Sequence, residues 1–152
     1  MIDGVVVKKL KLLRDNRGFL MEMLRSDDQI FKKFGQVYLS VCAPGYVKGW
    51  HYHKVQTDFF VVVYGKGKVA LYDMREGSIT KGEVQEFIMG TDDPFLMTIP
   101  PGVLHGIECV GKVPCYLINV PTEPYHYKTP DEFRVDPFNN EVPYKWTATK
   151  GN

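Results

Sequence analysis

The sequence predicts an all-β fold, a sandwich or barrel built from many short strands. Short apolar segments recur at regular intervals along the chain, and Gly and Pro residues stand between them. The chain has 152 residues with 44% hydrophobic content, which suits one domain with a sizeable core. Because no linker, repeat or low-complexity segment interrupts the pattern, we expect a single domain over residues 1–152.

The first elements predicted are two strands joined by a polar turn. Val5–Leu13 mixes apolar, basic and β-branched residues, which favours a strand. Arg14–Gly18 is polar and ends in glycine, so it reads as a turn. Phe19–Leu24 is the second strand.

One short helix is predicted next, over Ser26–Phe34. Ser26 can cap its first turn, and Gln29 completes a capping box of the Ser-x-x-Gln kind. Gly35 stands where a helix usually stops.

From position 36 the pattern is strands alone, with an irregular tail. The predicted strands are Val37–Cys42, Val47–His53, Asp58–Tyr64, Lys68–Asp73, Val84–Ile88, Phe95–Ile99, Val103–Cys109 and Cys115–Val120. Gly65-Lys66-Gly67 predicts a tight hairpin. The tail Pro121–Trp146 is rich in Pro, Tyr, Asp and Glu, and we expect it to pack irregularly across one mouth of the barrel.

Composition excludes several classes of function. The net charge is +1, which gives no case for a nucleic acid or a membrane surface as partner. No apolar run is long enough to span a bilayer, and the first residues do not resemble a secretory signal. Three cysteines without a Cys-x-x-Cys spacing predict a reduced, cytoplasmic compartment.

The centre of the chain carries the residues suited to chemistry. His51 and His53 share one face of a strand, and Trp50 and Tyr52 share the other, because side chains alternate with period two. Asp58 follows after a short polar turn. Two histidines and a carboxylate are costly to hide in an apolar core, so we expect them to line a cavity.

Two spacings around these residues resemble the cupin signatures. The first, Gly-x5-His-x-His-x4-acid-x6-Gly, is met by Gly45, His51, His53, Asp58 and Gly65. The second, Pro-x-Gly-x-x-His, is met by Pro100, Gly102 and His105. The resemblance implies a double-stranded β-helix, the cupin or jelly-roll barrel. Asp58 replaces the usual Glu of the first signature, and Cys109 replaces the usual Asn of the second.

Nearly the whole chain resembles the dTDP-4-dehydrorhamnose 3,5-epimerase family. Five segments carry the likeness in order: Asp15–Glu22, Lys48–Tyr52, Asp73–Ser78, Ile99–Gly106, and Asp136-Pro137 with Trp146. The resemblance implies an isomerase that removes a proton beside the ketone of a nucleotide-linked 4-keto-6-deoxy sugar. It implies His51 as the general base and Asp136 as the residue that orients it. A neutral imidazole backed by a carboxylate suits that task.

The same resemblance implies the substrate-binding residues. These are Arg17, Glu22, Gln36, Lys48, His105 and Asn119. Lys48 replaces an arginine of the family and keeps its charge without the bidentate fork. Related epimerases are homodimers whose N-terminal strands cross between subunits, and Val5–Val7 is compatible with such an exchange.

Two departures leave the reaction open. Asp58 stands where the family has a lysine, and Asn119 stands where it has the tyrosine that acts as general acid. Tyr38 and the run His51–Lys54 instead resemble the 3,4-ketoisomerases of nucleotide sugars, which gives Tyr38 and His53 catalytic roles. The sequence therefore predicts a nucleotide-sugar epimerase or ketoisomerase.

Two alternatives remain beside this reading. We expect no cofactor, because the epimerase family is metal-free. His51, His53, Asp58 and His105 nevertheless supply ligands for a divalent transition metal at the positions that cupins use. A non-catalytic cupin that binds a small molecule is the third possibility, since the fold alone does not fix function.

Overall fold

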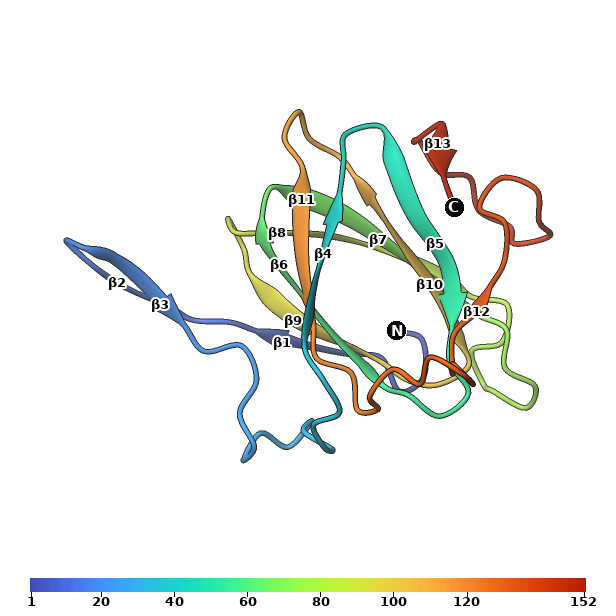
Figure 1. Cartoon of the computed structure of the whole chain (residues 1–152), viewed down its shortest axis with the longest axis horizontal. Coiled ribbons are helices and arrows are strands. Elements are labelled where there is room, and N and C mark those ends of the chain that lie inside the picture. The colour runs from blue at the N-terminus through green and yellow to red at the C-terminus, as the bar shows by residue number, and fades with distance from the viewer.

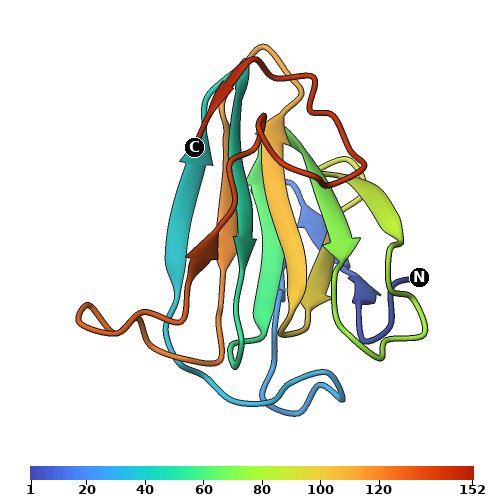
Figure 2. The same cartoon turned by 90° about the vertical axis from the view of Figure 1, so that its right-hand side faces the viewer.

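Two β-sheets packed face to face form the body of the protein (Figures 1 and 2). The computed structural model describes all residues from 1 to 152. The first sheet has the strand order β1 (Val6–Lys9), β9 (Phe95–Ile99), β6 (Asp58–Tyr64), β11 (Cys115–Asn119) and β4 (Tyr38–Cys42). The second has the order β12 (Phe133–Arg134), β5 (Tyr46–Tyr52), β10 (Val103–Cys109), β7 (Lys66–Asp73) and β8 (Val84–Gly90), and β13 (Lys150–Gly151) also pairs with β5. The predicted all-β jelly-roll fold is confirmed.

The core lies between the sheets, where the most apolar strands meet. Strands β9 and β10 are buried along their whole length. Alternation along β7 turns Val69 and Leu71 inward, into one cluster with Met97 and Ile99 of the opposite sheet. Fully burying a side chain of this size stabilises the fold by about 1.5–3 kcal/mol.

The predicted helix over Ser26–Phe34 is wrong, because the segment forms turns and bends. Its backbone bonds join residues three apart, as from Phe31 N to the carbonyl of Asp28. The Asp28 carboxylate accepts hydrogen bonds from Lys8 Nζ at 2.5 Å and from Arg25 N at 2.8 Å. An isolated helix this short is marginally stable. The hydrogen bonds of Asp28 to Lys8 and Arg25 therefore stabilise the turns in its place. No helix in the structure is long and apolar enough to cross a membrane.

The predicted hairpin at Gly65-Lys66-Gly67 is also wrong. β6 and β7 lie in different sheets, so the chain changes sheet at Gly65. Gly65 has a φ of +69°, and a Cβ there would lie 2.4 Å from the carbonyl oxygen of Pro114. Only glycine fits this corner.

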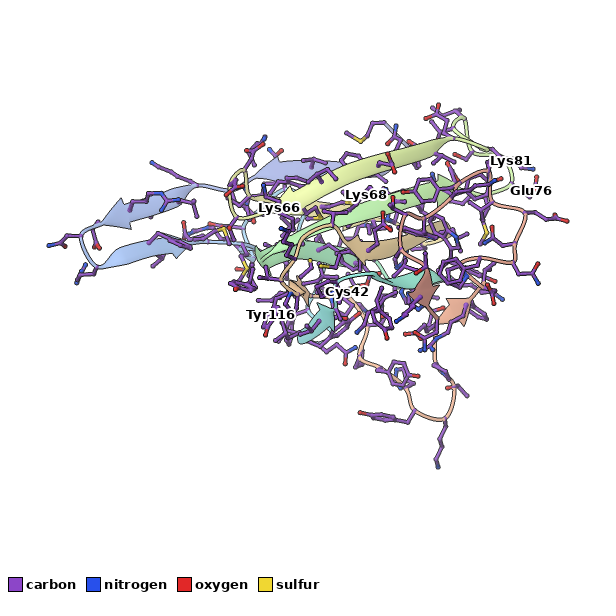
Figure 3. All side chains as sticks on the ribbon, turned by 90° about the horizontal axis from the view of Figure 1, so that it is seen from above. Cys42, Lys66, Lys68, Glu76, Lys81 and Tyr116 are labelled. Atoms are coloured by element: carbon purple, nitrogen blue, oxygen red, sulfur yellow. The ribbon has the colours of Figure 1, made fainter.

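The predicted strand Val5–Leu13 divides into β1 and a second strand, β2 (Leu12–Asp15). β2 pairs with β3 (Gly18–Met21) in a two-stranded hairpin that stands away from the sandwich (Figures 1 and 3). The tail after Pro121 is irregular apart from β12 and β13, and it returns Trp146 to within 4.7 Å of Trp50, ring centre to ring centre.

Candidate active site

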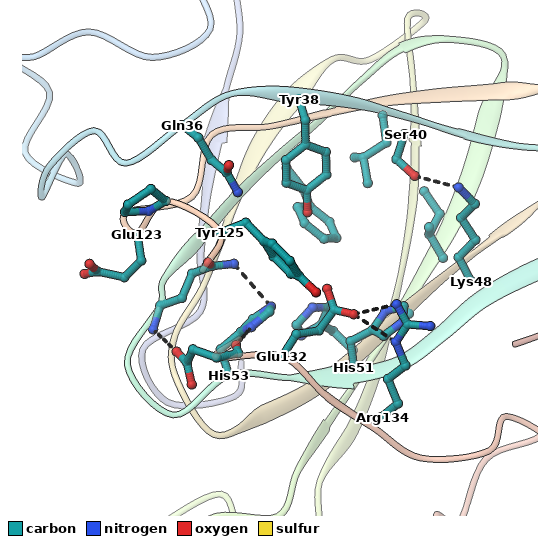
Figure 4. Close-up of a pocket in the computed structure, with 18 of the residues that line it drawn as sticks. Gln36, Tyr38, Ser40, Lys48, His51, His53, Glu123, Tyr125, Glu132 and Arg134 are labelled. Carbon is teal, nitrogen blue, oxygen red and sulfur yellow. Dashed lines mark hydrogen bonds and ion pairs between the residues drawn. The ribbon is translucent and has the colours of Figure 1, made fainter. Parts of the chain in front are cut away.

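A cavity of about 620 Å³ opens between the two sheets (Figure 4). Strands β4, β5, β6, β10 and β11 contribute to its walls, and the tail contributes its rim through residues 123–126, 131, 132 and 134. This volume lies in the range of pockets that take small organic ligands. The alternation of each strand decides which of its side chains reach the cavity.

His51 extends into the cavity from β5 and is partly buried. It is the register partner of His105 on β10, and the two ring centres are 6.3 Å apart. Trp50 points to the other face of the sheet and packs against Trp146, as strand alternation requires. Burial, followed by the neighbouring His105, lowers the pKa of His51 to about 4. The imidazole is therefore neutral at physiological pH and can accept a proton.

Asp58, the first residue of β6, is buried behind two histidines. Its Oδ1 accepts hydrogen bonds from Gln56 Nε2 at 2.7 Å and Asn119 Nδ2 at 2.8 Å. Its Oδ2 lies 3.2 Å from His53 Nε2 and 3.3 Å from His105 Nε2. Burial acts to raise the pKa of Asp58, but these partners outweigh burial and hold the pKa below its ordinary value.

The other ring nitrogens of these two histidines face backbone carbonyls. His53 Nδ1 donates to the carbonyl of Asp131, and His105 Nδ1 donates to the carbonyl of Val103 at 3.0 Å. Both Nε2 atoms therefore converge on the same oxygen of Asp58, and all three ligand atoms lie within 4.8 Å of one another. Two nitrogen lone pairs facing one carboxylate oxygen call for a cation, either a proton or a metal ion.

A proton fits this position best on His53. Burial acts to lower the pKa of His53, but its hydrogen bond and charge interaction with Asp58 outweigh burial and raise the pKa. Burial dominates at His105 and lowers the pKa of that imidazole. The cluster thus sets Asp58 beside two imidazoles with opposite pKa shifts, raised at His53 and lowered at His105.

Tyr38 reaches the cavity from β4, in the opposite sheet to His51 (Figure 4). Its hydroxyl oxygen lies 2.9 Å from Asn119 Nδ2. Burial of the ring, followed by the charge of Asp58, raises the pKa of Tyr38 to about 12. The phenol therefore keeps its proton at neutral pH.

Further polar side chains line the cavity beside apolar ones such as Phe60 and Leu117. Lys48 Nζ donates to Ser40 Oγ at 3.0 Å. Arg134, the register partner of His51, pairs with Glu132 through Nε at 2.8 Å and Nη2 at 2.7 Å.

The cavity brings together most of the residues that the sequence singled out. Those that line it are Gln36, Tyr38, Lys48, His51, His53 and His105. Asp58 and Asn119 lie directly behind the lining and are fully buried.

Three singled-out residues lie outside the cavity of this chain. Arg17 and Glu22 belong to the projecting hairpin segment, and their ion-pair partners are Asp15 and Arg25. Asp136 lies in an exposed turn after β12, where its Oδ1 accepts from two backbone N–H groups at 2.8 Å. The structure does not bring Asp136 to His51, because the backbone N–H groups of Phe138 and Asn139 occupy its carboxylate.

Sequence reasoning missed several residues of the tail. Asp131 accepts hydrogen bonds from the backbone N–H groups of residues 54–56 at 2.8–2.9 Å, and its carbonyl holds His53. Glu132 and Arg134 also line the cavity, as does Tyr125. The only signal for them was the acidic and aromatic composition of the tail, since no spacing links them to the histidines.

A jelly-roll sandwich with histidines on the inner faces of β5 and β10 and an acid on β6 defines a cupin-type site. Residues 13–133 match the family model described as the polysaccharide biosynthesis C-terminal domain. The match covers most of the chain, so the protein belongs to this family.

Two curated relatives are similar over nearly their whole length. Spore coat polysaccharide biosynthesis protein SpsL of Bacillus subtilis is 42% identical over 148 residues, which are 97% of this chain and 98% of the relative. The probable low-salt glycan biosynthesis epimerase Agl13 of Haloferax volcanii is 38% identical over 149 residues, 97% of this chain and 96% of the relative.

Solved structures share the fold, and one of them is a dTDP sugar isomerase. A dTDP sugar isomerase from Desulfovibrio desulfuricans superposes with a TM-score of 0.90 and 31% identity, covering 95% of this chain and 92% of the other. The dTDP-6-deoxy-D-glucose-3,5-epimerase of Legionella pneumophila, solved with dTDP-4-keto-L-rhamnose, has a TM-score of 0.85, 23% identity and coverage of 99% and 83%. The second likeness shows the shared fold.

Proposed function

We propose that this protein is an isomerase-class enzyme, an epimerase of a dTDP-4-keto-6-deoxy sugar. It removes a proton from the carbon beside the ketone and returns one to the same carbon. Two similar proteins support the class of reaction and substrate, one named a dTDP sugar isomerase and the other a probable epimerase of glycan biosynthesis. The cavity of about 620 Å³ is large enough to enclose a hexose.

The observation that carries the proposal is the placement of a base and an acid on opposite walls. His51 is neutral and comes from the six-stranded sheet, whereas Tyr38 is protonated and comes from the five-stranded sheet. His51 takes the proton, and the electron pair of the C–H bond forms an enolate with the neighbouring ketone. Tyr38 then protonates that carbon from the other face, which restores the ketone and inverts the configuration.

This placement favours epimerisation over keto migration. A 3,4-ketoisomerase moves protons between adjacent carbons and can use bases on one face of the sugar. Acid and base on opposite faces instead suit inversion at one carbon. Tyr38 would then take the role that the related family gives to the tyrosine replaced here by Asn119.

Exchange of the C3 proton with solvent separates the two steps. With dTDP-4-keto-6-deoxyglucose in deuterated water, NMR of the wild-type protein is expected to show deuterium at C3 and an inverted product. His51→Asn should abolish both signals. Tyr38→Phe should keep the exchange and lower product formation about 100-fold, since a general acid typically contributes that much or more.

Tyr46→Phe is the matched control for the tyrosine variant, because the two residues are similarly exposed and Tyr46 lies outside the cavity. It should leave both rates unchanged. Full deuterium uptake in His51→Asn would contradict the role of His51. Absence of exchange in the wild-type protein with any 4-keto nucleotide sugar would contradict the function itself.

For substrate binding we assign Lys48 to the negative charge of the diphosphate and Gln36 to the sugar or the nucleotide. We also propose a homodimer, in which the projecting hairpin of one chain reaches the cavity of its partner. Arg17 and Glu22 would then contact the nucleotide from the neighbouring subunit. The exposure of Arg17 in the single chain fits this role, with 86% of its side chain accessible.

A metal-dependent reaction is the second candidate. The observation that favours it is the convergence of His53 Nε2, His105 Nε2 and Asp58 Oδ2, with both Nδ1 atoms already held by carbonyls. A cation in this position would hold the substrate ketone beside His51. Elemental analysis of protein purified without a metal-affinity column decides between the candidates. A stoichiometric transition metal lost in Asp58→Ala would favour the metal, and its absence in active protein would favour the proton.

We propose a cytoplasmic location. All three cysteines, Cys42, Cys109 and Cys115, are buried and unpaired, as expected of a protein kept in a reducing compartment. A nucleotide-sugar substrate fits the same compartment.

A further inference from the structure

We propose that Asn119 is a positioning residue, whose side-chain amide aims the hydroxyl proton of Tyr38 into the cavity. The inference deepens the proposed function and rests on it, because it concerns how the acid of that reaction is held. Asn119 makes no contact with the cavity surface itself and is fully buried at the end of β11. Its role is therefore exerted through Tyr38.

Two hydrogen bonds fix which way the amide of Asn119 faces. The backbone N–H of Phe59 donates to Oδ1 at 3.0 Å, and Nδ2 donates to Asp58 Oδ1 at 2.8 Å. An ionised carboxylate only accepts and an N–H only donates. Turning the amide over would bring Oδ1 against the carboxylate and Nδ2 against the N–H. Nδ2 therefore faces Tyr38.

The direction of that amide decides where the proton of Tyr38 points. Nδ2 donates to the hydroxyl oxygen of Tyr38 at 2.9 Å, so this oxygen is the acceptor of the bond. The bond is the only one that the hydroxyl makes within the protein. The single O–H of Tyr38 is thereby left unused and points away from Asn119, toward the cavity that Tyr38 lines (Figure 4).

Neither an aspartate nor an alanine at position 119 would keep this arrangement. An aspartate at position 119 would accept the Tyr38 proton and turn it away from the cavity, and it would set a second carboxylate beside Asp58. An alanine would leave the phenol without this donor and free to rotate its proton toward the carboxylate of Asp58, whose charge acts on it. Both changes remove a correctly aimed acid without removing the base His51.

The test compares product formation with C3 exchange in the same sample. Asn119→Ala should lower the rate of epimer formation at least tenfold relative to the rate of C3 exchange, through kcat and with KM little changed. Gln56→Ala is the matched control, because Gln56 also donates to Asp58 Oδ1, at 2.7 Å, but does not contact Tyr38. It should leave the ratio of the two rates as in the wild-type protein. An unchanged ratio in Asn119→Ala would overturn the proposal.

A double variant shows whether Asn119 acts through Tyr38. In a Tyr38→Phe background, Asn119→Ala should cause no further fall in the ratio, whereas a further tenfold fall would contradict the proposal. Where Asn119→Ala fails to fold, Asn119→Asp takes its place, since it keeps the acceptor for Phe59 N–H. It should lower the ratio at least as much.

A measurement made without substrate tests the role of Asn119 independently of the proposed function. In ¹⁵N-labelled protein, the side-chain NH₂ group of Asn119 should give a resonance protected from solvent exchange. Tyr38→Phe should shift that resonance, and Tyr46→Phe should not. No shift in Tyr38→Phe would overturn the inference whatever the enzyme acts on.

Discussion

At the scale of single residues, environment separates three histidines that the sequence presents as equivalent. His51 is partly buried without a carboxylate bonded to it, so burial keeps it neutral. His53 is bonded to Asp58 and holds a proton more tightly than an ordinary histidine. His105 is buried completely and stays neutral beside the same carboxylate. One residue type thus provides a neutral base at His51 and two imidazoles, His53 and His105, whose pKa values shift in opposite directions.

The first prediction concerns the pH dependence of the base. Only neutral His51 accepts a proton, and its pKa is lowered to about 4, so C3 exchange should stay constant from pH 8 down to about pH 5. Below pH 4 the rate should fall about tenfold per pH unit. NMR exchange rates measure this, with circular dichroism at each pH to verify that the protein is folded. An inflection near pH 6.5 would contradict the assignment.

At the scale of elements, the loop between β7 and β8 owes its form to one buried carboxylate. Asp73 ends β7 and accepts hydrogen bonds from Arg75 Nε and Nη2 at 2.8 Å, and from Ser78 Oγ and Thr80 Oγ1 at 2.6 Å. Arg75 Nη2 also donates to the carbonyl of Asp3 at 2.7 Å, which ties the N-terminus to this loop. The segment that resembled an epimerase motif is therefore a structural element, remote from the cavity.

Asp73→Asn should lower the free energy of unfolding at pH 7 by about 3 kcal/mol, because it breaks a buried ion pair. The hydrogen bond and charge of Arg75 hold the pKa of Asp73 below its ordinary value, so its stabilisation is present above about pH 4 and is lost as pH falls below that. The difference in free energy of unfolding between the variant and the wild-type protein should become smaller in acid. Urea unfolding at pH 7 and pH 3 measures it.

Asp92→Asn is the control for this change, since Asp92 is exposed and pairs only with Lys66. It should leave the free energy of unfolding unchanged at both pH values. Equal stability of Asp73→Asn and Asp92→Asn at pH 7 would show that the buried network contributes nothing.

At the scale of the whole molecule, one part of the chain projects from the sandwich and leaves apolar side chains uncovered. The hairpin of β2 and β3 stands off the sandwich and exposes Leu13, Phe19 and Leu20 (Figure 1). A two-stranded hairpin with apolar side chains in water is marginally stable alone. A second copy of the chain would cover it, in line with the dimer proposed above.

Light scattering should give a mass of about 35 kDa, twice the 17.4 kDa of one chain. Phe19→Asp should shift the mass toward the monomer and lower kcat/KM, because Arg17 would leave the partner's cavity. Phe138→Asp is the matched control, since Phe138 is 51% exposed and Phe19 is 52% exposed. A wild-type protein of 17.4 kDa in solution would contradict the dimer.

The sequence predicted most of the strands and the cluster of His51, His53, Asp58 and His105. Strand alternation and turn residues are local properties, and they fix which side chains share a face whatever the rest of the chain does. Predictions failed where a contact between distant segments outweighed the local preference of the sequence. Ser26–Phe34 has a local preference for helix, but the bonds of Asp28 to Lys8 and Arg25 hold it as turns.

By itself, the sequence determined the sandwich and the face of β5 that holds the imidazoles. Only the tertiary structure decided which hydrogen bonds the side chains of the site form. Asp131 reaches His53, Asn119 reaches Tyr38, and both contacts join segments some 80 residues apart. The periodicity of the sequence does not encode such contacts, because they depend on how the two sheets pack against each other and where the irregular tail packs against them.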